Sequence, residues 1–222
     1  MSEPKYALTI NVRHYCLLLL VVALLLIAIH TGLYLYNYQV EELPWLLLQL
    51  FDLDEENNIP TWFSSFLLLN NAFVLYLITT AKATERRYYW GMMAAGFFIL
   101  AVDEVAGLHE SFNTAIDSNW AIFGGILVLL VVLAFIPFLL SLPRRLALLF
   151  ILSGAGFVSG AIIVELLSED MDSDSLAYMM AVMVEEGLEM LGALLFLFVN
   201  LRTMASQQLV PVHISVSYSR SD

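Results

Sequence analysis

Long apolar stretches alternate with short polar segments along this chain, and the alternation predicts helices that cross a membrane. A membrane-spanning helix needs about 20 predominantly apolar residues. Six stretches reach that length, over residues 15–37, 60–81, 88–110, 119–141, 144–167 and 175–201. The sixth contains three acids and is predicted from the apolar residues that flank them. We therefore expect an all-α, polytopic membrane bundle of six transmembrane helices.

The connections between these stretches predict how the helices are organised. Those over residues 81–87 and 141–145 are short, which favours antiparallel neighbours packed side by side. The longest connection, 38–59, contains an apolar run that starts at Trp45 and is too short to span, as in an interfacial or re-entrant helix. We expect one transmembrane domain over residues 1–203 and a polar cytoplasmic tail over 204–222.

Composition supports the membrane class and excludes others. Of 222 residues, 60% are hydrophobic and 14% are charged, which excludes a soluble domain, a disordered chain and a nucleic-acid binder. The net charge of −12 would itself repel nucleic acid. Cys16 is the single cysteine, so neither an intrachain disulfide nor a cysteine-based zinc site can form.

Charge is divided between the two sides of this predicted bundle. If each stretch crosses a bilayer, all nine Lys and Arg fall on one side, and only three of the 21 acids, Glu3, Glu85 and Asp222, fall with them. Cationic loops stay in the cytoplasm. Both termini are therefore predicted to be cytoplasmic, and the acidic face is predicted to be extracytoplasmic.

Several acids and two histidines are predicted to lie within or beside the outer halves of the helices. Helix rise places Asp103 about 24 Å above Arg87, and Glu189 about 20 Å above Arg202. Ionisable groups inside a membrane are costly and mark function by default. The candidate metal ligands are His30, Asp52, Asp54, Asp103, Glu104, His109, Glu110, Glu165, Glu185 and Glu189. Glu186 is the candidate catalytic general base.

No Lys or Arg is predicted to lie near these acids, so their charge must be balanced in another way. Either several are protonated and hydrogen-bonded to one another, or a cation binds among them. Carboxylates with imidazole suit Zn, Fe, Mn or Ca, and oxygen-only subsets favour Ca²⁺, Mg²⁺ or Mn²⁺. We expect a divalent metal.

Glycines near the acids predict close packing. Asp103, Gly107 and Glu110 share one stripe of a continuous helix, where Gly107 permits the close approach of another backbone or a ligand. In the last stretch, Gly187 and Gly192 favour tight helix contact.

Three segments resemble those of an uncharacterised group of bacterial multi-span inner-membrane proteins. They are FDLDEENNIPTWFSS (51–65), LAVDEVAGLHE (100–110) and VEEGLEMLGALLFL (184–197). The resemblance covers most of the chain and implies no established activity. It implies a multi-pass protein of the bacterial inner membrane. From the spanning stretches we expect the lipid bilayer as a partner, and a homo-oligomer or a membrane complex is left open.

Three functions follow from these observations. The first is a metal-binding membrane protein, with intramembrane metal-dependent catalysis left open. The second is a cation or proton transporter, and the third is an accessory subunit of a membrane complex. A permeation route generally needs polar groups through the full thickness. The runs 91–100 and 191–199 are almost wholly apolar, which favours a cup closed on its inner side.

Overall fold

A computed structural model describes residues 11–81, 86–109, 111 and 120–206, and within these ranges the chain is helical, without strands. Each of the six predicted stretches contains a long helix, with ends that differ by a few residues. The helices are α1 (Val12–Gln39), α2 (Trp45–Phe51), α3 (Ile59–Thr80), α4 (Arg87–Ala106), α6 (Trp120–Ser141), α7 (Arg144–Val158), the π-helical η1 (Ser159–Val164), α8 (Glu165–Ser168) and α9 (Leu176–Ser206).

Five helices are long and apolar enough to cross a membrane, namely α1, α3, α4, α6 and the continuous helix from Arg144 to Ser168. This finding indicates a membrane protein. Within the described ranges α9 is not among them, so the structure does not establish the predicted count of six. The short helix predicted in the first long connection is α2.

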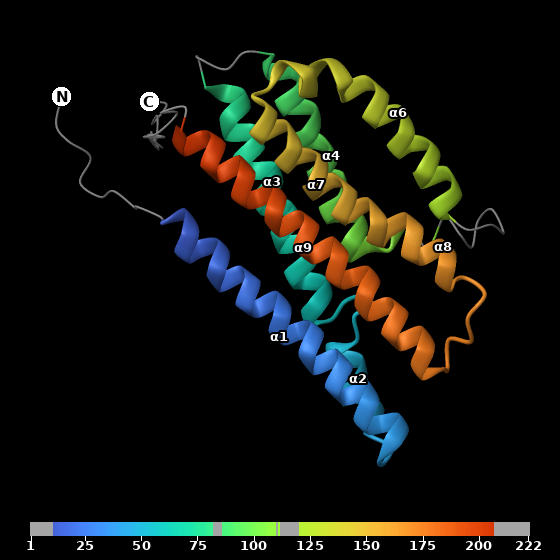
Figure 1. Cartoon of the computed structure of the whole chain (residues 1–222). Helices are drawn as coiled ribbons and strands as arrows, with labels where there is room; N and C mark the ends of the chain where they lie inside the picture. The colour runs from blue at the N-terminus through green and yellow to red at the C-terminus, as the bar shows by residue number, and fades with distance from the viewer. Residues whose placement is uncertain (1–10, 82–85, 110, 112–119, 207–222) are drawn as a thin grey trace, which may run out of the picture.

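Helix α9 lies in the middle of the bundle and packs against α1, α3, α7 and η1 (Figure 1). Helices α3 and α4 form a closely packed pair. Helix α6 lies at the edge and contacts α7 and η1. The start of α1 and the end of α9 lie at the same end of the bundle (Figure 1).

Polar side chains set two of the helix ends. Asn58 caps α3, because its Oδ1 accepts a hydrogen bond from the Thr61 N–H at 3.1 Å, and Pro60 occupies the first turn. Helix α4 ends sooner than predicted, because Gly107 adopts a left-handed conformation (φ 54°) as its C-cap. The prediction of one continuous stripe from Asp103 to Glu110 was therefore wrong at Gly107. Glu110 itself lies outside the described residues.

The long helix that starts at Arg144 contains a wide turn at η1, next to α9. A Cβ atom on Gly160 of η1 would lie 2.5 Å from the Glu185 carbonyl oxygen and 2.9 Å from Glu189 Cγ. Only glycine allows this approach, so the wide turn lies directly against the acidic part of α9. Such π-helical turns are rare in proteins, and those that do occur are often found at functional sites.

Candidate functional site

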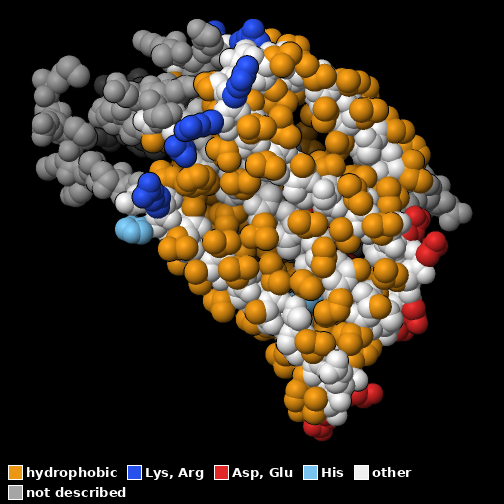
Figure 2. Space-filling view, viewed as in Figure 1, with side chains coloured by type: hydrophobic (Ala, Val, Ile, Leu, Met, Phe, Trp, Pro, Cys, Tyr) orange, Lys and Arg blue, Asp and Glu red, His pale blue; other side chains and the backbone are white. Residues whose placement is uncertain are grey.

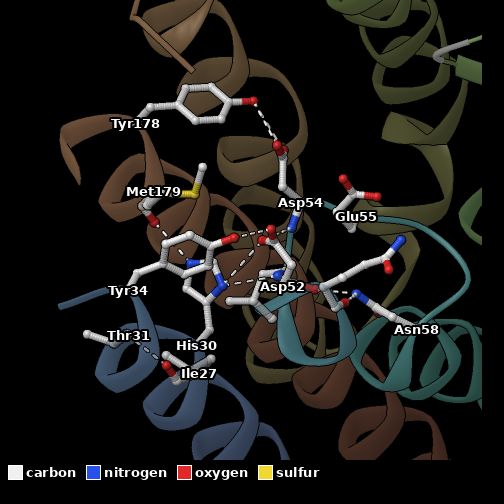
Figure 3. A network of polar contacts seen from close by, with 12 residues as sticks. Ile27, His30, Thr31, Tyr34, Asp52, Asp54, Glu55, Asn58, Tyr178 and Met179 are labelled. Carbon is white, nitrogen blue, oxygen red and sulfur yellow. Dashed lines mark hydrogen bonds and ion pairs between the residues drawn. The ribbon is translucent and has the colours of Figure 1, made fainter. Parts of the chain in front are cut away.

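His30 of α1 joins three segments of the chain (Figure 3). Its ring is fully buried, and Nδ1 accepts a hydrogen bond from the Leu53 N–H at 3.1 Å. Because Nδ1 is an acceptor, Nε2 carries the proton and donates to the Met179 carbonyl oxygen at 3.2 Å. His30 is therefore held as the neutral Nε2–H tautomer, with both ring nitrogens bonded to backbone groups.

Asp52 is part of the same buried network (Figure 3). The Tyr34 hydroxyl donates a hydrogen bond to its Oδ2, and the Asp54 N–H donates to its Oδ1 at 3.1 Å. Asn58 Nδ2 donates to the Asp52 carbonyl oxygen at 2.6 Å. Together these bonds fix the loop between α2 and α3 against α1 and α9. The structure thus gives His30 and Asp52 a positioning role.

The same loop carries two acids to other helices. The Asp54 carboxylate accepts from the Tyr178 hydroxyl of α9 at 3.1 Å (Figure 3). The Glu56 carboxylate lies against Gly107, where an added Cβ would be 2.2 Å from Glu56 Oε2. The absence of a side chain at Gly107 therefore leaves room for Glu56 beside the end of α4.

Asp103 and His109 form a pair across the left-handed turn that ends α4. The His109 N–H donates to Asp103 Oδ1 at 3.0 Å, and His109 Nδ1 lies 3.1 Å from Asp103 Oδ2. The imidazole also contacts the Trp120 ring at the start of α6, with centroids 5.3 Å apart. Both members of the pair keep part of their surface exposed, 30% for His109 and 25% for Asp103.

Glu104 of α4 and Glu189 of α9 line one small cavity with room for about one water molecule. Ser64 of α3 also lines it, beside Glu104, and apolar side chains complete its wall. Among the described residues, the buried Ser64 hydroxyl has no hydrogen-bond partner of normal geometry. Three helices thus place two carboxylates and one hydroxyl around the same space.

Further acids lie close enough to act on these two electrostatically. Glu104, Glu185, Asp103 and Glu165 act on Glu189, and Glu189 in turn acts on Glu186. In the described part of the chain, however, no group of three or more His, Cys, Asp and Glu is arranged so as to hold a metal ion. A cation at this position would therefore need water or a shift of side chains to complete its coordination.

The predicted site residues fall into separate groups. His30 lies beside Asp52, Asp103 beside His109, Glu104 beside Glu189, and Asp54 beside Tyr178. Glu165 is the first residue of α8, directly after the wide turn. Nothing in these positions tests metal binding or a catalytic role for Glu186, and both stay predictions.

Sequence reasoning missed several polar residues at these positions. Ser64, Tyr34 and Tyr178 were not singled out, because hydroxyl groups are common in apolar helices and carry little signal. Asn200 was also missed, although its Nδ2 donates to Asn71 Oδ1 at 3.0 Å near the C-terminal end of α9. A fully buried amide on a membrane helix is a usable signal, because it needs a polar partner.

Charged side chains gather at opposite ends of the molecule. Figure 2 shows Arg at one end of the visible face and Asp and Glu at the other. No ion pair joins Arg to an acid in the described ranges. Two histidines there lie near acids: the neutral His30 ring is 3.5 Å from Asp52, and the His109 ring is 3.1 Å from Asp103. The acids around the cavity therefore have no Arg side chain to balance them within those ranges, and His109 is the basic side chain that acts on Glu104 and Glu185.

Comparison with protein families gives one match, to a family described as a domain of unknown function (DUF8692), over residues 17–204. No match was found among curated proteins or among solved structures. The family description assigns no activity, in agreement with the resemblance seen in the sequence.

Proposed function

Since the chain belongs to the DUF8692 family, which has no assigned activity, we propose a function from its own side chains: an integral membrane protein that binds a cation in the outer half of its helical bundle. One observation carries the proposal. Glu104, Glu189 and Ser64 come from three helices and line the same cavity. Two carboxylates in one apolar enclosure need a positive partner or protons.

We propose the following placement in the membrane. Helix α9 crosses as a sixth span, because its Glu189 lines the cavity inside the bundle and most of its other residues are apolar. The arginine-rich end faces the cytoplasm of a bacterial cell, and both termini lie there. The acids around Glu189 then lie toward the extracytoplasmic side of the inner membrane.

The leading occupant is a hard divalent cation such as Mn²⁺ or Ca²⁺. The cavity wall offers oxygen atoms from Glu104, Glu189 and Ser64, and neither His nor Cys lines it. Oxygen donors favour Ca²⁺, Mg²⁺ or Mn²⁺ over the softer Zn²⁺. Glu185, an electrostatic neighbour of Glu189, is the acid we propose to complete the coordination after a change of rotamer.

Elemental analysis of the detergent-purified protein tests this proposal, after equilibration with Mn²⁺ or Ca²⁺ and removal of free metal. We expect near-stoichiometric metal in the wild type and at least a tenfold loss in Glu189→Gln, since even outer-shell changes cost about 10–100-fold in affinity. Glu169→Gln, an exposed acid beyond α8, should keep its metal. A wild-type protein without bound metal would refute the metal site.

If no metal is bound, the negative charge of the acids must be removed by protonation. Infrared spectroscopy would then show the band of a protonated carboxyl group, and this band would be lost in Glu189→Gln and kept in Glu169→Gln. The acids would act as a hydrogen-bonded network that stabilises the outer end of the bundle. Catalysis with Glu186 as general base is a further proposal, which depends on a bound metal and a substrate.

Cation or proton transport is the second candidate, favoured by a polar pair below the cavity. Asn71 of α3 and Asn200 of α9 are fully buried and hydrogen-bonded to each other, and among the described residues Asn200 Oδ1 has no partner. Such a pair provides a polar step in the inner half of the bundle, which the sequence had indicated to be closed. Uptake of Mn²⁺ or protons by proteoliposomes, lost in Glu189→Gln, would support transport.

A further inference from the structure

Helix α6 is only loosely attached to the bundle along its middle third. The positions that contact the rest of the protein, among them Ala121, Gly125, Phe135 and Phe138, recur at intervals of three and four residues and define its inward face. Val131 and Val132 fall on the same face by this spacing. They are nevertheless 48% and 50% exposed, close to the 55% of Leu133 on the opposite face.

The two ends of α6 contact the bundle, whereas its middle is exposed. At the outer end, the Cβ position of Gly125 lies 3.6 Å from Ile162 Cγ2 of η1, and Trp120 contacts His109. At the inner end, Phe138 packs against Tyr89, Trp90 and Phe150. Nine residues, 126–134, lie between Gly125 and Phe135, and the two positions are roughly 15 Å apart along the helix.

An apolar cleft therefore runs between the middle of α6 and the rest of the bundle. Figure 1 shows α6 apart from its neighbours at the edge of the molecule, and the surface there is hollowed in Figure 2. Every side chain from Ile126 to Ala134 is aliphatic, and all but Val128 are exposed. Six consecutive exposed residues, 129–134, cover more than one full turn, so the described residues give this part of α6 little cover on any side.

The chemistry of this segment favours a lipid chain over another protein helix. Helix contacts inside membranes use small residues and polar groups that let backbones approach. The segment 126–134 has one Ala and otherwise Ile, Leu and Val, without a polar atom in its side chains. Its side chains match the hydrocarbon of the membrane, and the surrounding bilayer supplies acyl chains directly.

The outer end of the cleft limits which lipid fits. Asp103 and His109 lie there beside Trp120, and both are partly exposed. The described Arg residues all lie near the opposite ends of their helices, so an anionic headgroup would be repelled by the acids and would have no Arg to pair with. An amine-bearing headgroup would instead donate a charge-assisted hydrogen bond to the Asp103 carboxylate.

We propose that the cleft between α6 and the bundle binds a long-chain, amine-bearing lipid, with its chain against Val131 and Val132 and its amine at the Asp103–His109 pair. The proposal goes beyond the cation site, because it uses a different cavity and other side chains. It gives the protein a lateral opening through which an amphiphile reaches the acidic end from within the bilayer.

The test is photolabelling of the full-length protein in phosphatidylcholine vesicles. Three probes carry the same mid-chain diazirine and differ only in the head, which is a primary amine, an alcohol or a carboxylic acid. Mass spectrometry of the digested protein locates the label. We expect the amine probe to label residues 126–134 most strongly and the acid probe least.

Variants separate the cleft from the ordinary lipid-facing surface. Val131→Trp fills the cleft, and we expect amine labelling of α6 to fall about tenfold, equivalent to about 1.4 kcal/mol of binding. Leu133→Trp adds the same ring on the opposite face and should leave labelling unchanged. Asp103→Asn should reduce amine labelling to the level of the alcohol while the chain still enters.

Two results would overturn the inference. One is labelling that is equal in Val131→Trp and Leu133→Trp, because the probe would then be ordinary surrounding lipid. The other is a carboxylic acid probe that labels as strongly as the amine. Metal content measured on the same Val131→Trp preparation keeps the two proposals apart, because it should equal that of the wild type.

Discussion

Gly192 of α9 offers the sharpest test of how this bundle is packed. An added Cβ at this position would lie 2.6 Å from the Phe157 backbone nitrogen and 2.9 Å from its Cα. These are backbone atoms, so no change of rotamer relieves the contact. Helices α7 and α9 would have to separate by roughly 0.8 Å before ordinary van der Waals contact is restored.

The expected cost of Gly192→Ala follows from two opposing effects. Overpacking of this kind costs about 1–3 kcal/mol. Alanine recovers about 0.5–1 kcal/mol of helix propensity relative to glycine. The same recovery applies to Gly32→Ala on α1, where nothing lies within 4 Å of the new Cβ. The difference between the two variants therefore isolates the steric cost, about 1–3 kcal/mol, or roughly a 5- to 150-fold change in the unfolding equilibrium.

Unfolding by SDS in mixed micelles, followed by far-ultraviolet circular dichroism, measures this difference. Gly156→Ala is a second control within the same interface, because its Cβ would lie 3.8 Å from the Gly192 Cα, an ordinary contact. We expect Gly192→Ala to unfold at clearly lower SDS than both controls. If all three variants unfold together, the α7–α9 contact is looser than described and the reasoning is refuted.

Two further substitutions test the site. His30→Ala leaves the Leu53 N–H and the Met179 carbonyl without partners, at a cost of about 1–3 kcal/mol for each buried group. The SDS concentration at the unfolding midpoint should be well below that of His14→Ala, which changes an exposed histidine. Equal midpoints for the two variants would contradict the network. Gly107→Ala forces a side chain into a left-handed turn, at about 1–2 kcal/mol, and into the Glu56 carboxylate. Thermal unfolding should detect that loss against Gly96→Ala, which has open space, and a stable Gly107→Ala protein would contradict the turn.

Sequence alone predicted the helices well, because apolar length is sufficient to identify them and the charged linkers mark their ends. Helix rise predicted a similar height for Asp103 and Glu189, whereas the residue of α4 that lines a cavity with Glu189 is the neighbouring Glu104. Helix rise could not predict which direction each side chain faces. His30 has a suitable height, yet its ring nitrogens are bonded to Leu53 and Met179.

Local backbone geometry accounts for the rest of the difference. The sequence around Gly107 reads as a continuous helix, and only the left-handed turn brings His109 back onto Asp103. The loop between α2 and α3 depends on tertiary hydrogen bonds from Tyr34 and Asn58, which no local pattern reveals. The gap behind α6 was likewise hidden, because an apolar helix looks the same whether protein or lipid covers it.

The wide turn at η1 also has a consequence for how this chain tolerates change in length. Successive residues of an α-helix differ in direction by about 100°, so one additional residue in a wide turn resets the angular register of all that follow. Helix α8 begins at Glu165, directly after η1, so the direction of the Glu165 side chain depends on this change in angular register. A deletion of a single residue within 159–164 would preserve a helix of nearly the same length and hydropathy, yet would rotate Glu165 away from Glu185 and Glu189.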